Sequence, residues 1–206
     1  MPRVDPEVRR QAIVEAALNL FRRDGFDAVR VDDILEEVGL SKGGFYHHFK
    51  SREDILRQIV VNETVETMAS LSDSLVKDDP TAALAQLFLQ GSTNMGADIG
   101  VLSSLESFGA RSVYLDELEQ QLSLHLKPYL VRVIEQGIAS KAFRAVDSEA
   151  TAEIVLAVND HGNRSAVLNN IESERLRAYN QTALEVLGMH LGIEGRLQEI
   201  FSVQQS

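Results

Sequence analysis

The chain has 206 residues, of which 44% are hydrophobic and 25% are charged, so it is long enough for one large or two small globular domains with a packed core. Four prolines, thirteen glycines and no low-complexity tract exclude collagen-like, linker-rich and prion-like proteins. The absence of cysteine excludes disulfides, thiolate zinc sites, iron–sulfur clusters and a cysteine nucleophile. The sequence shows neither the apolar run of a secretory signal nor an apolar segment of membrane-spanning length, so we expect a soluble, cytoplasmic protein without a membrane partner.

Charge is distributed unevenly along the chain. Residues 1–58 contain ten Lys and Arg and eleven Asp and Glu, whereas residues 59–206 contain ten and twenty. Because an acidic surface repels a polyanion, any contact with nucleic acid is expected in the nearly neutral first segment. The isoelectric point of about 4.9 argues against the basic footprint of an ordinary DNA-binding protein.

Apolar residues recur at intervals of three and four, which predicts helices, and no segment alternates as a strand does. In chain order, the expected helices span residues 6–23, 31–38, 42–49, 51–77, 81–90, 101–110, 113–137, 148–169 and 174–191. Asp5, Ser41 and Asp147 are natural caps in front of three of them. Gly39 is expected to end a helix because glycine adopts the left-handed conformation at little cost. Pro128 is expected to kink or break the helix over 113–137.

Residues 31–49 combine two short helices with a tight, glycine-containing turn, which is the spacing of a helix-turn-helix. Apolar residues of this segment are predicted to pack against the first helix: Ile34, Leu35, Val38, Leu40, Phe45 and Phe49. The adjacent Gly43 and Gly44 each cost a helix about 1 kcal/mol relative to alanine, so we expect them to permit a close approach to another surface. We predict that this surface is DNA, with Ser41 and Lys42 near phosphate at the positive end of the helix.

The segment GFDAVRVDDILEEVGLSKGGFYHHFKSREDIL, within residues 8–57, resembles the amino-terminal domain of the TetR family of transcriptional regulators. The resemblance implies an all-α homodimer whose helix-turn-helix domains grip a palindromic double-stranded operator, and a carboxyl-terminal domain that binds a small-molecule effector and joins the subunits. It implies neither enzymatic activity nor a cofactor. We therefore assign residues 1–50 to a helix-turn-helix DNA-binding domain and residues 51–206 to a helical ligand-binding and dimerisation domain, with residues 51–77 as the connector.

Eight residues are predicted to contact DNA: Arg30, Ser41, Lys42, Gly43, Gly44, Tyr46, His47 and Lys50. For Lys42, Gly43, Tyr46, His47 and Lys50 the resemblance implies contacts to phosphates or base edges. Arg30 is a departure, because the family usually has Thr or Ser at this cap; the cap is weakened and a cation is gained beside the groove.

Arg52, and more weakly Arg9 and Arg10, are also predicted to contact phosphate. Each of these residues also has a simpler interpretation. In that interpretation Tyr46 is a core aromatic, and all of these cations form only a solvated face. His47 and His48 are a poor metal pair, because neighbours on a helix point about 100° apart, so no metal site is expected.

The remainder of the chain has no HExxH motif, no recognisable Ser/His/Asp order and no phosphate-binding glycine loop. Polar residues interrupt the apolar run EIVLAVNDHGNRSAVL, and bulky residues occur at helical spacing elsewhere, which permits a ligand pocket. Its candidate lining is Phe88, Phe108, His125, Tyr129, Asn159, His161 and Asn163; alternatively, the polar groups face water and the aromatics are plain core. An apolar stripe on the last helix predicts a dimer interface made by Leu176, Tyr179, Ala183, Leu187 and Leu191.

These features predict a sequence-specific transcriptional regulator, a repressor that a small molecule releases from a palindromic operator by changing the separation of its two DNA-reading helices. One alternative is a DNA-organising protein with the same head and no ligand. A second alternative is an enzyme, although no set of acid, base and nucleophile supports it.

Overall fold

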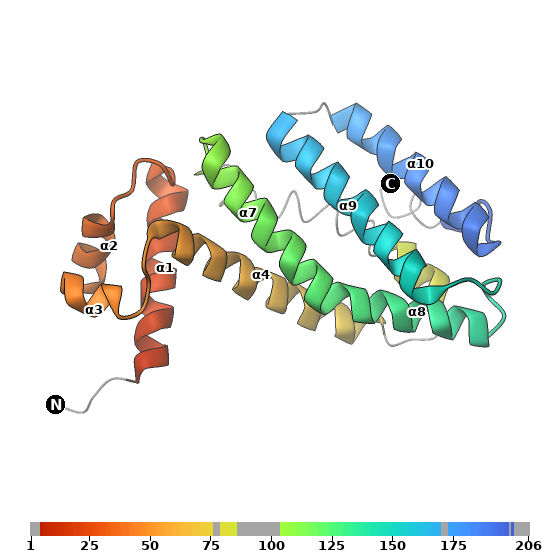
Figure 1. The fold of residues 1–206 in the computed structure, drawn as a ribbon, viewed down its shortest axis with the longest axis horizontal. Helices are drawn as coiled ribbons and strands as arrows, with labels where there is room; N and C mark the ends of the chain where they lie inside the picture. Colours follow the sequence, from red (N-terminus) through yellow and green to blue (C-terminus); the bar gives the residue numbers. More distant parts are fainter. Residues whose placement is uncertain (1–4, 76–78, 86–103, 170–172, 198, 200–206) are drawn as a thin grey trace. The chain divides into compact units, whose positions relative to one another are not determined.

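The computed structural model describes residues 5–75, 79–85, 104–169, 173–197 and 199. Within those ranges all regular structure is helical, which confirms the predicted all-α class (Figure 1). The described helices of the chain do not include one with the length and apolar character that a membrane crossing requires. Residues 91–100, between two predicted helices, and parts of the helices predicted at 81–90 and 101–110 lie outside the described residues.

The described residues divide into two compact units. The first comprises the chain up to Glu63 together with residues 104–118, and the second comprises residues 64–85 with the chain from Glu119 onward. The first unit is therefore larger than the predicted domain of residues 1–50. The division of DNA binding from ligand binding and dimerisation at residue 50 stays a prediction.

Local sequence explains the helices of the first unit. They are α1 (Pro6–Asp24), α2 (Val31–Val38), α3 (Lys42–Tyr46) and the first parts of α4 (Arg52–Leu75) and α7 (Phe108–Gln121). Asp5 Oδ1 accepts from Glu7 N at 2.9 Å, and Ser41 Oγ accepts from Gly44 N at 3.2 Å, so both predicted caps are confirmed. Gly39 ends α2 in the left-handed conformation with φ 65°.

The core of the first unit holds the helix-turn-helix in place. Phe21 of α1, Ile34 of α2 and Phe45 of α3 are fully buried, together with Ile55 and Leu56 of α4. Leu35 and Phe49 are also buried, whereas Val38 and Leu40 are half-buried against the same core, so the predicted inward face is confirmed. Because the inward face of α3 is buried in this core, only the opposite face of α3 is available to a partner.

The second unit is built around α8 (Lys127–Ala139), α9 (Ser148–Asn169) and α10 (Ser173–Leu191), and residues 80–85 are also helical. α9 packs against both α8 and α10 (Figure 1). The cap predicted for α9 is confirmed, because Asp147 Oδ1 accepts from Ala150 N at 2.9 Å.

The predicted helix over 113–137 differs from the structure in two ways. Helical structure begins earlier, at Phe108, and Leu122–Leu126 form a π-helical turn between α7 and α8. Pro128 lies in the first turn of α8, where its missing N–H costs no hydrogen bond, so the distortion precedes the proline.

Candidate nucleic-acid interface

α3 is shorter than predicted. The α-helix ends at Tyr46, and His47 and His48 form a turn in which Phe49 N donates to Phe45 O at 3.0 Å. Two glycines in five residues weaken the helix, and the turn brings Phe49 into the core. A five-residue helix has a small dipole, so a contact of Ser41 or Lys42 with phosphate depends on the side chains more than on the dipole.

The outer face of α3 carries an aromatic side chain and an open backbone. Tyr46 is 55% exposed, and its ring meets the Phe45 ring only at the edge, so the alternative of a core aromatic is wrong. A Cβ placed on Gly43 would meet no atom within 4 Å, whereas one on Gly44 would lie 3.4 Å from Ser41 Oγ. The packing of the protein itself therefore does not require a glycine at position 43.

The cations near α3 fall into two groups. Arg9, Arg30, Lys42 and Lys50 have exposed side chains. Lys42 is paired with the exposed Asp32 of α2, and its Nζ lies 2.9 Å from Asp32 Oδ1 and 3.3 Å from Oδ2. The hydrogen bond to that carboxylate, and its charge, raise the pKa of Lys42.

Arg10 and Arg52 have structural roles within the protein, which differs from the prediction that they contact phosphate. Arg10 donates to His48 O at 3.0 Å and to Gln58 Oε1 at 2.6 Å, and its guanidinium lies 4.3 Å from the centre of the Phe49 ring. Arg52 donates to the backbone oxygens of Phe26, Asp27 and Val29. Both guanidinium groups thus support the loops that carry the helix-turn-helix.

Arg30 occupies the cap of α2 without capping it through its side chain. Its backbone N–H donates to Asp33 Oδ2 at 2.7 Å, which supplies one half of a capping box. The side chain of Arg30 is therefore not needed as a helix cap.

The two histidines after α3 differ in environment. Their rings meet edge to face at 5.3 Å, with His47 exposed and His48 half-buried. Burial, followed by the charges of His47, Arg9 and Arg10, lowers the pKa of His48 below its ordinary value of 6.5, while Glu7 opposes the shift. In the described part of the chain no group of three or more His, Asp or Glu side chains is placed to hold a metal ion.

The predicted pocket residues do not gather in one unit. Phe108 is 70% exposed and belongs to the first unit, and His125 and His161 are exposed in the second. Asn159 and Tyr129 are half-buried, and no hydrogen-bond partner for the Tyr129 hydroxyl is found among the described residues. Phe88 and the side chain of Asn163 lie outside the described residues.

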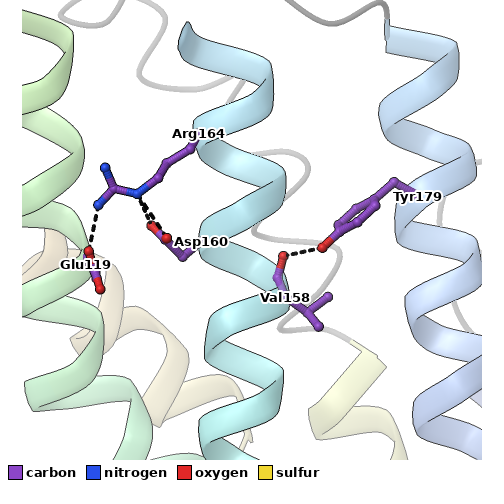
Figure 2. Close-up of polar contacts among 5 residues, drawn as sticks. All are labelled: Glu119, Val158, Asp160, Arg164 and Tyr179. Carbon is purple, nitrogen blue, oxygen red and sulfur yellow. Dashed lines mark hydrogen bonds and ion pairs between the residues drawn. The ribbon is translucent and has the colours of Figure 1, made fainter. Parts of the chain in front are cut away.

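Other polar groups of the interrupted run are paired within the chain. Arg164 Nε donates to Asp160 at 2.9 and 3.0 Å, and its Nη2 donates to Glu119 of α7 at 2.6 Å (Figure 2). Tyr179 of α10 donates to the carbonyl of Val158 at 2.8 Å, as Figure 2 also shows. Arg164, Asp160 and Tyr179 therefore need neither a ligand nor a partner to satisfy these atoms.

A cavity in the described part of the second unit lies between α9 and α10. It has a volume of about 310 Å³ and an almost wholly apolar lining, formed by Thr151, Ile154, Val155, Val158, Tyr179, Thr182, Ala183, Val186, Leu187 and His190. We call it the α9–α10 groove.

The predicted dimer stripe faces this groove only in part. Tyr179, Ala183 and Leu187 line it, Leu176 is half-buried, and Leu191 has no exposed surface because it packs in the subunit's own core. Leu191 is therefore a core residue and not a contact residue. The large apolar side chains that are exposed on these helices are Ile154, Val186 and Met189.

Comparison with known proteins identifies the helix-turn-helix. The family model described as "Bacterial regulatory proteins, tetR family" matches residues 13–59, which include α2 and α3. The chain belongs to the TetR family. The uncharacterized HTH-type transcriptional regulator YfiR of Bacillus subtilis is 28% identical over 159 residues, which cover 74% of this chain and 77% of YfiR.

Further relatives agree with the assignment to the TetR family. The negative regulator IcaR of the Staphylococcus epidermidis biofilm operon is 36% identical over 50 residues, or 24% of this chain and 27% of IcaR. The crystal structure of RolR in complex with resorcinol is 19% identical, covers 96% of this chain and 94% of RolR, and has a TM-score of 0.70, which supports the fold. This TetR-family protein is a DNA-binding transcriptional regulator and not an enzyme.

Sequence reasoning missed Asp32 in this TetR-family head. Asp32 lies ten positions before Lys42, and only the turn between α2 and α3 brings the two side chains together. An acidic residue in the first turn of a helix is ordinarily explained by the helix dipole, so its spacing offered no indication of the pair.

Proposed function

We propose that this TetR-family regulator is a repressor that binds a palindromic operator as a homodimer and dissociates when a small molecule binds its second unit. The observation that carries the proposal is the outer face of α3, where the exposed Tyr46 adjoins the open backbone of Gly43. An aromatic side chain with a hydroxyl and a glycine that nothing inside the protein requires suit a surface that lies against a duplex.

The proposed DNA contacts are Arg30, Ser41, Lys42, Gly43, Gly44, Tyr46, His47 and Lys50. Arg30 and Lys50 have exposed cationic side chains that can neutralise phosphates, and the Tyr46 hydroxyl can donate to a phosphate or a base edge. Gly43 allows the backbone of α3 to approach DNA closely.

The α9–α10 groove supports the homodimer. Ile154 and Val186 are exposed and line the groove, and removal of such apolar side chains from water favours association. A second copy of the same two helices would cover the groove by a two-fold axis, which is the commonest symmetry of homo-oligomers. The separation of the two α3 helices would then depend on the second units.

Release by a small molecule is supported by a buried hydroxyl and by similarity. Burial raises the pKa of Tyr129 to about 12, and its hydroxyl, for which the described residues supply no hydrogen-bond partner, costs free energy that a ligand acceptor could recover. RolR, which shares this fold, was crystallised with resorcinol, and IcaR is named a negative regulator.

The decisive experiment measures sequence-selective DNA binding by the purified full-length chain. Duplexes selected from a random pool, and DNA adjoining the protein's own gene, should yield one palindromic site that the protein protects from nuclease cleavage. Tyr46→Ala should weaken that complex at least tenfold and leave the dimer intact by sedimentation, whereas the control Leu124→Ala, at an exposed residue of the π-helical turn, should not change it.

Repression and release have separate outcomes. Deletion of the gene should raise transcription from the promoter that contains the protected site, and at least one compound of a broad metabolite panel should lower operator affinity. Many scattered sites without regulated neighbours, and no response to any compound, would instead favour a DNA-organising protein.

A further inference from the structure

The Lys42–Asp32 ion pair lies at the start of α3. Lys42 Nζ is within hydrogen-bond distance of both carboxylate oxygens of Asp32, at 2.9 and 3.3 Å, and the two side chains are 69% and 65% exposed. Such an exposed pair contributes little to folding, because water and salt screen it. Its position beside the proposed DNA-reading face therefore calls for an explanation other than stability.

A phosphate and Asp32 compete for the same ammonium group. When α3 approaches a duplex, Lys42 either keeps its carboxylate partner or exchanges it for a phosphate oxygen. If Lys42 keeps Asp32, the pair adds no net positive charge, and the carboxylate itself is brought towards a polyanion. Residues 1–58 carry one more acidic than basic residue, so their net charge does not attract DNA. Attraction to the phosphates depends on the few cations near α3, and the loss of one of them removes a large part of it.

We propose that Asp32 is a specificity-determining residue, whose carboxylate competes with DNA phosphate for Lys42 and thereby weakens binding to non-operator DNA. This inference rests on the proposed function. On non-operator DNA, affinity comes almost entirely from phosphate contacts, so a cation held by Asp32 is a direct loss. On the operator, base contacts hold α3 in one register, and a phosphate at a fixed position can displace Asp32 from Lys42.

The test compares Asp32→Asn with Glu36→Gln, which removes the same charge at an exposed position of α2 outside the ion pair. Affinity for a random-sequence duplex and for the selected operator is measured at 50 and 200 mM salt, after thermal melting shows that both variants are folded. One additional phosphate contact makes the slope of log affinity against log salt concentration steeper by about 0.9. For Asp32→Asn on random DNA, the ratio of the affinity at 50 mM salt to that at 200 mM salt should therefore rise about 3.5-fold over the wild-type ratio. Operator affinity should change less, so the preference of Asp32→Asn for operator over random DNA should be lower than that of the wild type at 50 mM salt.

A double-variant cycle isolates the role of Lys42. In a Lys42→Ala background, Asp32→Asn should no longer strengthen binding to random DNA beyond the effect of Glu36→Gln. An equal gain with and without Lys42, an equal gain from Glu36→Gln, or weaker binding by Asp32→Asn would each overturn the proposal while leaving the repressor function standing. A wild-type protein that selects no sequence from a random pool would overturn the proposed function, and this inference with it.

Discussion

The substitution Gly43→Ala distinguishes a glycine required for folding from a glycine required for DNA binding. In the free protein the added Cβ would meet no atom within 4 Å, so no steric cost is expected. Alanine is favoured over glycine within a helix, and we expect the free energy of unfolding to rise by about 0.5–1 kcal/mol. If the backbone of α3 lies against the duplex, the added methyl group must push α3 away from the DNA. Operator affinity should then fall about tenfold, or about 1.4 kcal/mol.

The assay combines urea unfolding with operator binding measured at one salt concentration. The matched control is Gly109→Ala, because Gly109 is also the second residue of its helix and a Cβ there would also meet no atom within 4 Å. The control should gain similar stability and keep its operator affinity. Unchanged operator affinity in a stabilised Gly43→Ala protein would refute the close approach of α3 to DNA, and a loss of stability would refute the argument from open space.

Three further perturbations test the packing, the titration and the assembly. Gly137→Ala would place a Cβ 2.0 Å from the buried Phe143 ring, so it should lower the free energy of unfolding by about 2 kcal/mol, seen as a lower urea midpoint at constant slope. Because the pKa of His48 is lowered in the folded state, the neutral ring is favoured there, and the free energy of unfolding should decrease as pH falls below 6.5; His48→Gln should show a smaller decrease in parallel urea titrations. Val186→Asp should give monomers by sedimentation with unchanged helical circular dichroism, because an unpaired charge would be buried in the groove, whereas Leu124→Asp should stay dimeric; a dimeric Val186→Asp protein would exclude the α9–α10 groove as the interface.

Most helix positions, and the ends that caps and Gly39 set, could be predicted from the sequence because those interactions are local, whereas the end of α3 and the start of α7 were misplaced. The caps Asp5, Ser41 and Asp147 each accept from a backbone N–H two or three residues further along, and Gly39 adopts φ 65° where a helix has to stop. Apolar periodicity likewise predicted which face of α2 and α3 is buried. The family resemblance rested on this same compact segment, which is why it was detectable without the rest of the chain.

Partners distant in sequence were decided only by the tertiary structure. The carbonyls that bind Arg52 lie 23 to 26 positions away, so nothing local distinguished this cation from Lys50, which stays exposed. The stripe on α10 illustrates the same limit, because an apolar face is equally suited to its own core and to a second copy. Leu191 packs into the core of its own unit, whereas Val186 remains exposed. Helical periodicity does not predict this difference, because the burial of each residue depends on where α9 lies.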